Sequence, residues 1–442
     1  MIGEAIRGQP RVGRVDAVPA GGAIFFSPKR LRWLSLLPTV LLALAALVVL
    51  AWTRFDGLYG QDSFAYFHYA TGPLRQGLLH VQQPPPFFWP PGYPLLVAAM
   101  SVLVGIIPLA GQIVSVAAGA AVPAFTVLLA AEMGKSDHPM ATNPRWQLVP
   151  LVAGLIVAVT GQLLQSSLVV MADTLGLALA TAGACAFVRY RRTGKARWLA
   201  ISAAAFAGAI ITRWIYGLVA LPFALWSPVL LAGRPRRVAL RHGAGAAAAA
   251  AVILGPVMVP AAAGLIAGGN LPFAGDLQVY SWSPVNAFRR VFVTGDGELS
   301  YSLPNGLYYA IAPAFWWFWG PPLAVLVLPG LRAVLRRGAM PPAYLLVAWV
   351  AIVYAFHAGA PWQNPRFALA YLPPLAILAA LGFAQLQAAA HQQTREMSRR
   401  IFRTDGNDCL GRTLAAWPKA RPIRAVECVP VAFVRFAPRH VE

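Results

Sequence analysis

Charged side chains are scarce in this 442-residue chain: Asp, Glu, Lys and Arg together make up 12% of it, whereas hydrophobic residues make up 58%. Soluble globular domains carry about 25% charged and roughly 45–50% apolar residues. The composition therefore excludes an ordinary soluble enzyme. It also excludes a disordered chain, which has too few apolar residues to bury. We expect an all-α polytopic membrane protein.

Cysteines and familiar catalytic motifs are also few. The three cysteines, Cys185, Cys409 and Cys428, lie far apart, so the sequence holds neither a disulfide framework nor a CxxC metal site. It has no phosphate-binding GxxxxGK[ST] loop, no HExxH zinc motif and no GxSxG nucleophile motif. Nucleotide-driven chemistry and the common hydrolase mechanisms are therefore not indicated.

Acidic residues are outnumbered: 15 Asp and Glu face 36 Lys and Arg, which gives a net charge of +21. Such a charge can indicate nucleic-acid binding, but here the basic residues gather in short loops between apolar runs. A helix needs about 20 apolar residues to cross a bilayer. Ten runs have about this character: 33–52, 111–131, 148–165, 168–188, 198–212, 214–232, 243–267, 308–328, 343–357 and 367–386.

The basic loops predict the topology, because cytoplasmic loops are rich in Lys and Arg. All of them face the cytoplasm only if the short stretch 95–110 lies on the outer surface as a juxtamembrane helix. We therefore predict about ten transmembrane helices with both termini cytoplasmic. The basic N-terminus 1–32 leads into an uncleaved signal anchor, 33–387 forms the membrane domain, and 388–442 is a basic cytoplasmic tail. The net positive charge is thus explained mostly by basic loops that orient the chain in the membrane, and no nucleic-acid partner is expected.

Two outer loops, 53–94 and 268–307, are long enough to build a site. The first holds Asp62 at the expected start of an aromatic-rich surface helix that Gly72-Pro73 should interrupt. Asp62 is either a helix N-cap, worth about 1 kcal/mol, or a general base for an acceptor hydroxyl; the two roles are compatible. Asp56 is a second candidate base or a loop carboxylate.

Three further charged residues fall at outer helix ends. Asp173 lies near the end of an apolar run, where a membrane-embedded carboxylate costs roughly 2.5–3.5 kcal/mol and is by default functional, unless the helix starts at the interface. Arg213 and Arg366 can hold a phosphate in a bidentate fork or extend to lipid headgroups. Together these residues indicate a site for a lipid phosphate and a polar acceptor. A divalent metal near Asp62 and His68 has no supporting ligand spacing.

The order of these features resembles the GT-C superfamily of polytopic glycosyltransferases, in particular the bacterial group of protein mannosyltransferases and the lipid A aminoarabinose transferase (glycosyltransferase family 39-like). The resemblance covers about residues 30–387. The segments that carry it are Asp62 with Tyr66, Phe88 to Leu95 with its P-x-YP pattern, Ser166 to Asp173, Thr212-Arg213, and Arg366-Phe367 with Pro373-Pro374.

This resemblance implies an inverting glycosyltransferase that moves a sugar from a polyprenyl-phosphate donor to an envelope lipid, glycan or protein, on the outer face of a bacterial cytoplasmic membrane. Asp62 would be the general base and Asp173 would help to place the acceptor or a metal. Arg213 and Arg366 would hold the donor phosphate, and the aromatic residues Tyr66, Trp89 and Tyr93 would line the substrate site. Many relatives carry Asp-Glu where this chain has Asp62-Ser63, which weakens a metal proposal.

Two other functions remain open. One is a glycan polymerase or ligase of the same membrane class. The other is a lipid-linked sugar transporter or flippase, whose site would lie near the bilayer midplane. The charged residues gather at the outer surface and the middles of the spans are apolar, which favours surface chemistry.

Overall fold

The computed structural model describes residues 28–82, 84–85, 87–135, 148–266, 281–294, 297–336 and 341–413. Contacts divide the chain into two units, residues 1–388 and 389–442. The described part of the second unit, residues 389–413, is helical and is the end of α17 (Leu372–Thr413). Most of the basic N-terminus, the rest of the tail and the first part of loop 268–307 lie outside the described residues.

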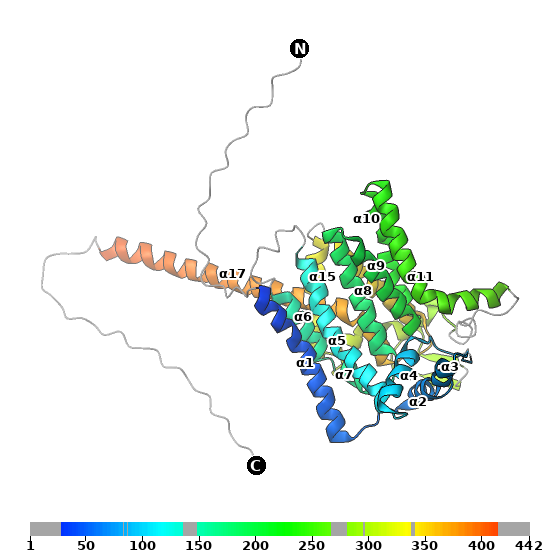
Figure 1. Cartoon of the computed structure of the whole chain (residues 1–442). Helices are drawn as coiled ribbons and strands as arrows, with labels where there is room; N and C mark the ends of the chain where they lie inside the picture. The colour runs from blue at the N-terminus through cyan, green and yellow to red at the C-terminus, as the bar shows by residue number, and fades with distance from the viewer. Residues whose placement is uncertain are drawn as a thin grey trace, which may run out of the picture. The chain divides into compact units, whose positions relative to one another are not determined.

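The first unit is a bundle of helices (Figure 1). Its longer helices are α1 (Pro28–Thr53), α5 (Leu109–Gly134), α8 (Asp173–Thr193), α9 (Ala196–Thr212), α10 (Tyr216–Ala232), α11 (Arg236–Ile266), α16 (Pro341–Gly359) and the start of α17. In sequence these segments are rich in Ala, Leu and Val, and α5, α8, α9 and α11 pack in series. Four helices of the described residues are long and apolar enough to cross a membrane, or five if one bent pair counts as a single span. The number ten stays a prediction.

Shorter elements connect these helices. They are α2 (Gly60–Tyr69), the π-helical turn η1 (Ala70–Leu74), α3 (Arg75–His80), α4 (Gly92–Val104), α6 (Val149–Ala158), α7 (Gly161–Leu168), η4 (Pro284–Phe288), α13 (Asn305–Ile311), η5 (Ala312–Ala314), α14 (Pro321–Val325), α15 (Val327–Arg336) and the 3-10 helix η6 (Pro365–Tyr371). Strands β1 (Val291–Thr294) and β2 (Gly297–Ser300) form an antiparallel hairpin in which Val291 pairs with Ser300 and Thr294 with Gly297.

Two expected spans are wrong as single helices. Residues 148–165 are divided between α6 and α7, which are bent by 56° relative to each other. Residues 308–328 are divided among α13, η5, a turn, α14 and the start of α15. Pro313 is the second residue of η5 and Pro321 is the first residue of α14, because proline has no N–H to continue a preceding helix and is tolerated in a first turn. Gly320 has φ +75°, a backbone conformation that favours glycine and ends the turn before α14.

The stretch expected to lie on the membrane surface forms a short helix. It begins at Gly92 and ends at Val104, so α4 has 13 residues. At 1.5 Å per residue it is about 20 Å long, less than the roughly 30 Å of the hydrocarbon core. Its length fits the predicted juxtamembrane helix, whereas its position at the outer surface stays a prediction.

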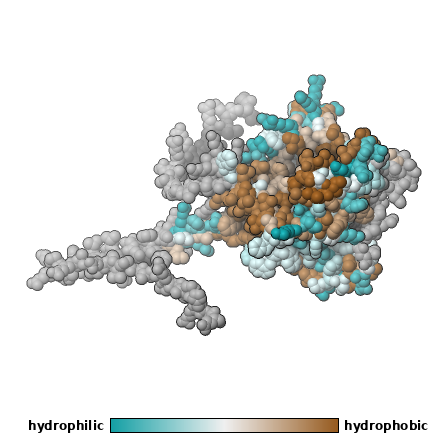
Figure 2. All heavy atoms as spheres, turned by 60° about the horizontal axis from the view of Figure 1, so that its bottom comes forward, coloured by the Kyte–Doolittle hydropathy of each residue, from teal (hydrophilic) through white to brown (hydrophobic). Residues whose placement is uncertain are grey.

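Glycines set the closest helix contacts. A Cβ at Gly176 of α8 would collide with the Tyr216 ring of α10, and one at Gly382 of α17 would collide with the Leu326 carbonyl. Small residues allow helices in a membrane to approach closely and pack by dispersion. The outward surface is apolar over a broad area (Figure 2), with exposed side chains such as Leu225 and Val252. Such a surface suits contact with lipid chains.

Candidate functional site

The link between α1 and α2 is fixed by hydrogen bonds to distant parts of the chain. Gly57 O accepts from Val170 N at 2.9 Å, and Gln112 Nε2 donates to Phe55 O at 2.9 Å. Gly57 has φ +87°, and a Cβ there would collide with the Gln112 side chain. Only glycine therefore fits this close approach, which places α2 beside α5 and the segment before α8.

Asp62 lies in the first turn of α2, and its expected role as an N-cap is wrong. The helix begins at Gly60 with Tyr59 as the N-cap, and Tyr59 caps nothing with its side chain. Ser63 makes the side-chain hydrogen bond at the helix start instead, because its Oγ accepts from Tyr59 N at 2.6 Å. Asp62 is thus free to point away from its own helix end, where the helix dipole still favours its negative charge.

The expected interruption at Gly72-Pro73 takes the form of a π-helical turn. Residues Ala70–Leu74 widen the helix, and α3 continues from Arg75. Pro73 has no N–H, and the wider turn accommodates it without ending the helix. As a result α2, η1 and α3 are continuous, and they pack with α4 at one end of the bundle (Figure 1).

Asp62 pairs with Arg366. The distance from Arg366 Nη2 to Asp62 Oδ2 is 2.5 Å, and Arg366 Nη1 contacts Met171 Sδ at 2.7 Å. Arg366 is the second residue of η6, and the Oδ1 of the N-cap residue Asn364 accepts from its backbone N at 3.1 Å. The Nε atom of Arg366 is buried and has no hydrogen-bond partner. This arginine therefore retains a donor for a further ligand.

Asp173 pairs with Arg213. Asp173 is the first residue of α8 and is only 3% exposed, and its Oδ1 contacts Arg213 Nη1. Its backbone oxygen accepts from Tyr216 OH at 3.1 Å, while its Oδ2 is buried without a hydrogen-bond partner. Arg213 lies in the link between α9 and α10. The structure therefore places Asp173 at a helix start, yet buries it.

One aromatic ring joins the two ion pairs. The guanidinium carbon of Arg213 lies 5.2 Å from the centre of the Phe367 ring, and that of Arg366 lies 5.3 Å from it. The four residues Asp62, Asp173, Arg213 and Arg366 therefore form one group, which we call the charged cluster. Two acids and two bases make its formal charge zero.

Tyr66 lies beside the charged cluster. Burial raises the pKa of its phenol, Arg213 and Arg366 lower it, and Asp62 raises it. Its ring stacks on Trp89, with the centres 4.8 Å apart, and meets Tyr93 edge-on at 5.4 Å. Because the pKa is raised overall, Tyr66 remains a neutral hydrogen-bond donor at physiological pH.

Tyr93 is fully buried. Its hydroxyl donates to Gly111 O at 3.1 Å and lies 2.9 Å from Ser115 Oγ, and burial raises its pKa. Tyr93, which we expected to contact substrate, therefore packs edge-on against the Tyr66 ring. Trp89 is half-buried, and its ring also meets Phe87 and Phe88 edge-on.

Asp56 is not brought to the charged cluster. It is exposed, and its Oδ1 accepts from Leu58 N at 3.0 Å in a local turn. No three His, Cys, Asp or Glu side chains gather into a metal-binding group among the described residues.

Sequence reasoning missed Phe367, His357 and Met171 as neighbours of the cluster. The His357 ring is buried, lies almost parallel to Phe367 with the centres 5.2 Å apart, and has both nitrogens without a hydrogen-bond partner. The position of Phe367 next to Arg366 was the only signal, and nothing in the sequence indicated Met171.

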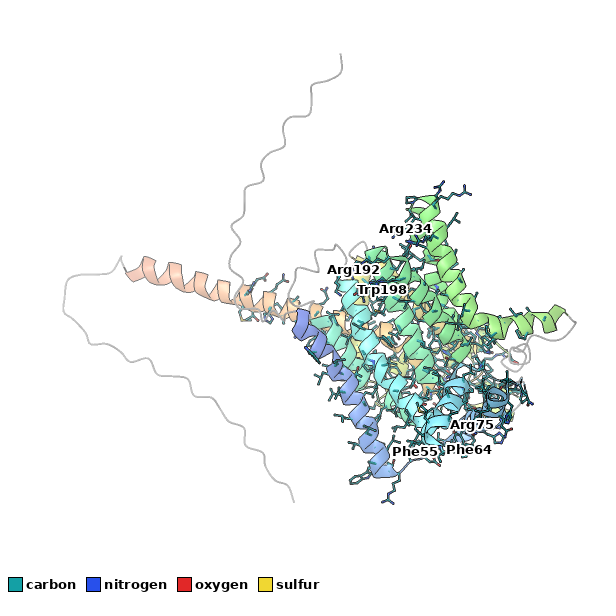
Figure 3. The ribbon with its side chains drawn as sticks, viewed as in Figure 1. Phe55, Phe64, Arg75, Arg192, Trp198 and Arg234 are labelled. Carbon is teal, nitrogen blue, oxygen red and sulfur yellow. The ribbon has the colours of Figure 1, made fainter. Side chains whose placement is uncertain are left out.

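The opposite end of α8 carries a second group of charges. Glu132 contacts Arg192 at 2.7 Å and Lys135 at 2.9 Å, and Arg189 lies 4.0 Å above the Trp198 ring. Because α8 has 21 residues, the two groups are about 30 Å apart along it. Figure 3 shows Arg192, Trp198 and Arg234 at one end of the bundle and Phe55, Phe64 and Arg75 at the other.

Solved structures share this arrangement of helices. ArnT from Cupriavidus metallidurans bound to undecaprenyl phosphate matches 78% of this chain with a TM-score of 0.56 at 16% identity, and its apo state matches 78% with a TM-score of 0.52 at 15% identity. The archaeal oligosaccharyltransferase AglB from Archaeoglobus fulgidus, in complex with an inhibitory peptide and a dolichol-phosphate, matches 84% with a TM-score of 0.50 at 15% identity. ArnT and AglB are GT-C superfamily membrane glycosyltransferases. This chain has the GT-C fold.

The likeness to GT-C proteins is one of fold. The matched regions cover 59% of each ArnT chain and 52% of AglB, so this chain spans less than two thirds of their length. No protein-family model matches the sequence, and no curated protein matches it. The predicted GT-C-like helical fold is confirmed.

Proposed function

We propose that this protein is an inverting glycosyltransferase that transfers a sugar from a polyprenyl-phosphate donor to an envelope lipid, glycan or protein. The observation that carries the proposal is the charged cluster, in which two acid–arginine pairs share the Phe367 ring. Glycosyl transfer from a lipid phosphate needs a base near the acceptor hydroxyl and positive charge near the departing phosphate. The cluster holds both kinds of group side by side.

In the proposed reaction Asp62 takes the proton from the acceptor hydroxyl. The hydroxyl oxygen bonds to the anomeric carbon from the face opposite the phosphate, and the bond from that carbon to the phosphate oxygen breaks. The phosphate leaves with the electron pair, and Arg213 and Arg366 stabilise its charge. The unpartnered Nε of Arg366 supplies a donor that the ion pair with Asp62 does not use.

Three neighbouring groups have supporting roles in this proposal. Asp173 holds Arg213 in place, and its second carboxylate oxygen, which has no partner, is available to an acceptor group. Tyr66 donates a hydrogen bond to substrate, and the half-buried Trp89 lines the sugar site. Asp56 is retained as a second candidate base.

Two features support the lipid-linked donor and the membrane location. ArnT was solved bound to undecaprenyl phosphate and AglB with a dolichol-phosphate, and both share this fold. The excess of basic residues at the Arg192 end of α8 favours a cytoplasmic position for that end, in a bacterial cytoplasmic membrane with both termini inside. The charged cluster then lies at the outer face. No charged residue occurs in α8 between Asp173 and Arg189, which argues against a midplane transport site.

Envelope glycan mass spectrometry tests the proposal. A deletion strain is complemented with wild type, Asp62→Asn or Asp56→Asn, the last as a matched exposed carboxylate in the same loop. We expect the deletion to lose a defined sugar, wild type and Asp56→Asn to restore it, and Asp62→Asn to fail. Restoration by Asp62→Asn but not by Asp56→Asn would assign the base to Asp56. An unchanged glycan profile in the deletion would contradict the function itself.

A further inference from the structure

The Phe367 ring is a neutral group that contacts both arginines of the charged cluster. The two guanidinium carbons lie at almost equal distances from its centre, 5.2 and 5.3 Å. The two arginines are therefore no further apart than the sum of these distances. Besides its own ion pair, each arginine therefore contacts this one shared side chain, which is neither an acid nor a substrate.

Aromatic faces attract cations through the ring quadrupole, and the attraction grows where water is excluded. Two guanidinium groups this close repel each other, and the negative face of the ring reduces that repulsion. The ring also accepts no conventional hydrogen bond, so its contact with the arginines does not itself use their N–H donors. Phe367 thus holds two cations together without occupying the groups that bind a phosphate.

The carboxylates of Asp62 and Asp173 cannot hold the two arginines in this way during a reaction. If donor phosphate takes hydrogen bonds from Arg213 and Arg366, it competes with Asp173 and Asp62 for those donors. The ring contact does not depend on this competition. We therefore expect the ring to stay in contact with both arginines when the phosphate binds.

The ring itself is held firmly. It is half-buried, its backbone N donates to Asn364 O at 3.1 Å, and His357 lies nearly parallel to it with an angle of 14° between the planes. Trp349 Nε1 donates to Ala370 O at 2.7 Å, which fixes η6 against α16. The support therefore comes from a buried part of the bundle that substrate does not enter.

We propose that Phe367 is a positioning residue that sets the spacing of the two phosphate-binding arginines. The proposal rests on the proposed function, and it adds a requirement that the ion pairs alone do not contain: the aromatic character of residue 367. If residue 367 carries a ring of the same size with a weaker quadrupole, we expect the two arginines to bind the donor phosphate less tightly.

The test measures binding of polyprenyl phosphate, without sugar, to the full-length protein in nanodiscs. We compare wild type with Phe367→Tyr, Phe367→Leu and a series in which residue 367 is mono-, di- or trifluorophenylalanine. Phe125→Leu, which changes a half-buried phenylalanine of α5, is the matched control. We expect Kd to rise stepwise with fluorination and about tenfold in Phe367→Leu, with Phe367→Tyr and Phe125→Leu close to wild type.

Kinetics provide a second readout. In Phe367→Leu we expect KM for the donor to rise about as much as Kd, with KM for the acceptor unchanged. A merely structural role for the ring predicts no trend with fluorine number, because fluorination barely changes its shape. The fluorinated series also keeps the test decisive if Phe367→Leu does not fold.

The outcomes separate the two proposals. If wild type binds polyprenyl phosphate and the whole fluorinated series binds equally well, the positioning role is wrong and the proposed function stands. If wild type does not bind polyprenyl phosphate, the proposed function fails.

Discussion

The two ends of α8 carry similar residues in different arrangements. At the Asp173 end, two acids meet two arginines, and each arginine also contacts the same aromatic ring. At the Arg192 end, one acid, Glu132, is shared by Lys135 and Arg192. Arg189 and Arg197 also lie over one ring, that of Trp198, but neither forms an ion pair with an acid among the described residues. The first end is balanced, whereas the second has excess positive charge.

The difference separates topology from chemistry. Excess cations in short loops are what orientation in a membrane requires, and they can lie on neighbouring helices. A balanced buried cluster is costly to assemble, because each charge loses water and must find its partner. Such an arrangement is expected where a reaction needs it.

The largest expected difference between the two ends concerns activity. Asp62→Asn removes the proposed base, and we expect the transfer rate of the purified protein to fall about 10²- to 10⁴-fold. Glu132→Gln, which changes the acid at the other end, should leave the rate within about threefold, since it lies roughly 30 Å away. Initial rates with a polyprenyl-phosphate sugar measure both. Equal losses in the two variants would remove the distinction between the ends.

A second difference concerns stability. Arg213→Leu leaves Asp173 buried without its cation, and we expect the free energy of unfolding to fall by about 3–5 kcal/mol. Arg192→Leu breaks a pair in which the arginine is about one third exposed, so we expect a loss of at most about 1 kcal/mol. Denaturant titration in detergent measures the two values. A larger loss for Arg192→Leu would show that the basic end is the more tightly coupled one.

The free-energy cost of adding a methyl group should also be larger near Asp173 than at the other end of the bundle. Gly176→Ala places a methyl group against the Tyr216 ring, one turn from Asp173, and we expect a cost of about 1–3 kcal/mol. Gly134→Ala, at the other end of the bundle, meets no atom within 4 Å and should be neutral or stabilising by about 0.4–1 kcal/mol. Thermal unfolding of both variants checks the prediction, and a similar melting temperature for the two would contradict it.

The smallest expected effect is at alkaline pH. Burial raises the pKa of Tyr66 above its ordinary value of 10.0. Folding therefore keeps the phenol protonated, so this contribution to stability is complete below pH 10 and is lost as pH rises through the folded pKa. We expect the free energy of unfolding to fall more steeply above pH 10 in wild type than in Tyr66→Phe. Matching slopes would mean that Tyr66 is accessible to water.

Local patterns predicted some of this structure well. The apolar runs indicated a helical membrane protein, and the resemblance of several segments to the GT-C superfamily implied a GT-C-like fold, which the solved structures confirm. Asp62, Asp173, Arg213 and Arg366 were all singled out, and the structure brings them together. Charge in an apolar setting is costly, so these residues stand out in a sequence.

The pairing itself was beyond sequence reasoning. Nothing local indicates that Asp62 meets Arg366 rather than Arg213, because the choice depends on how η6 packs against α7 and α8. The N-cap at Asp62 was predicted wrongly because the helix starts two residues earlier, at Gly60, which has φ +70°. Expected span 308–328 failed because prolines divided an otherwise apolar run.

The separation of the paired residues along the chain has a consequence for synthesis. Arg213 follows Asp173 by 40 residues, so these two can meet soon after both have been translated. Asp62 must wait for Arg366, 304 residues later. At about 5–20 residues per second the interval is roughly 15 to 60 s. During that time the ribosome has delivered the acid without its partner, so a nascent chain released early would carry an unneutralised carboxylate that a membrane quality-control protease could recognise.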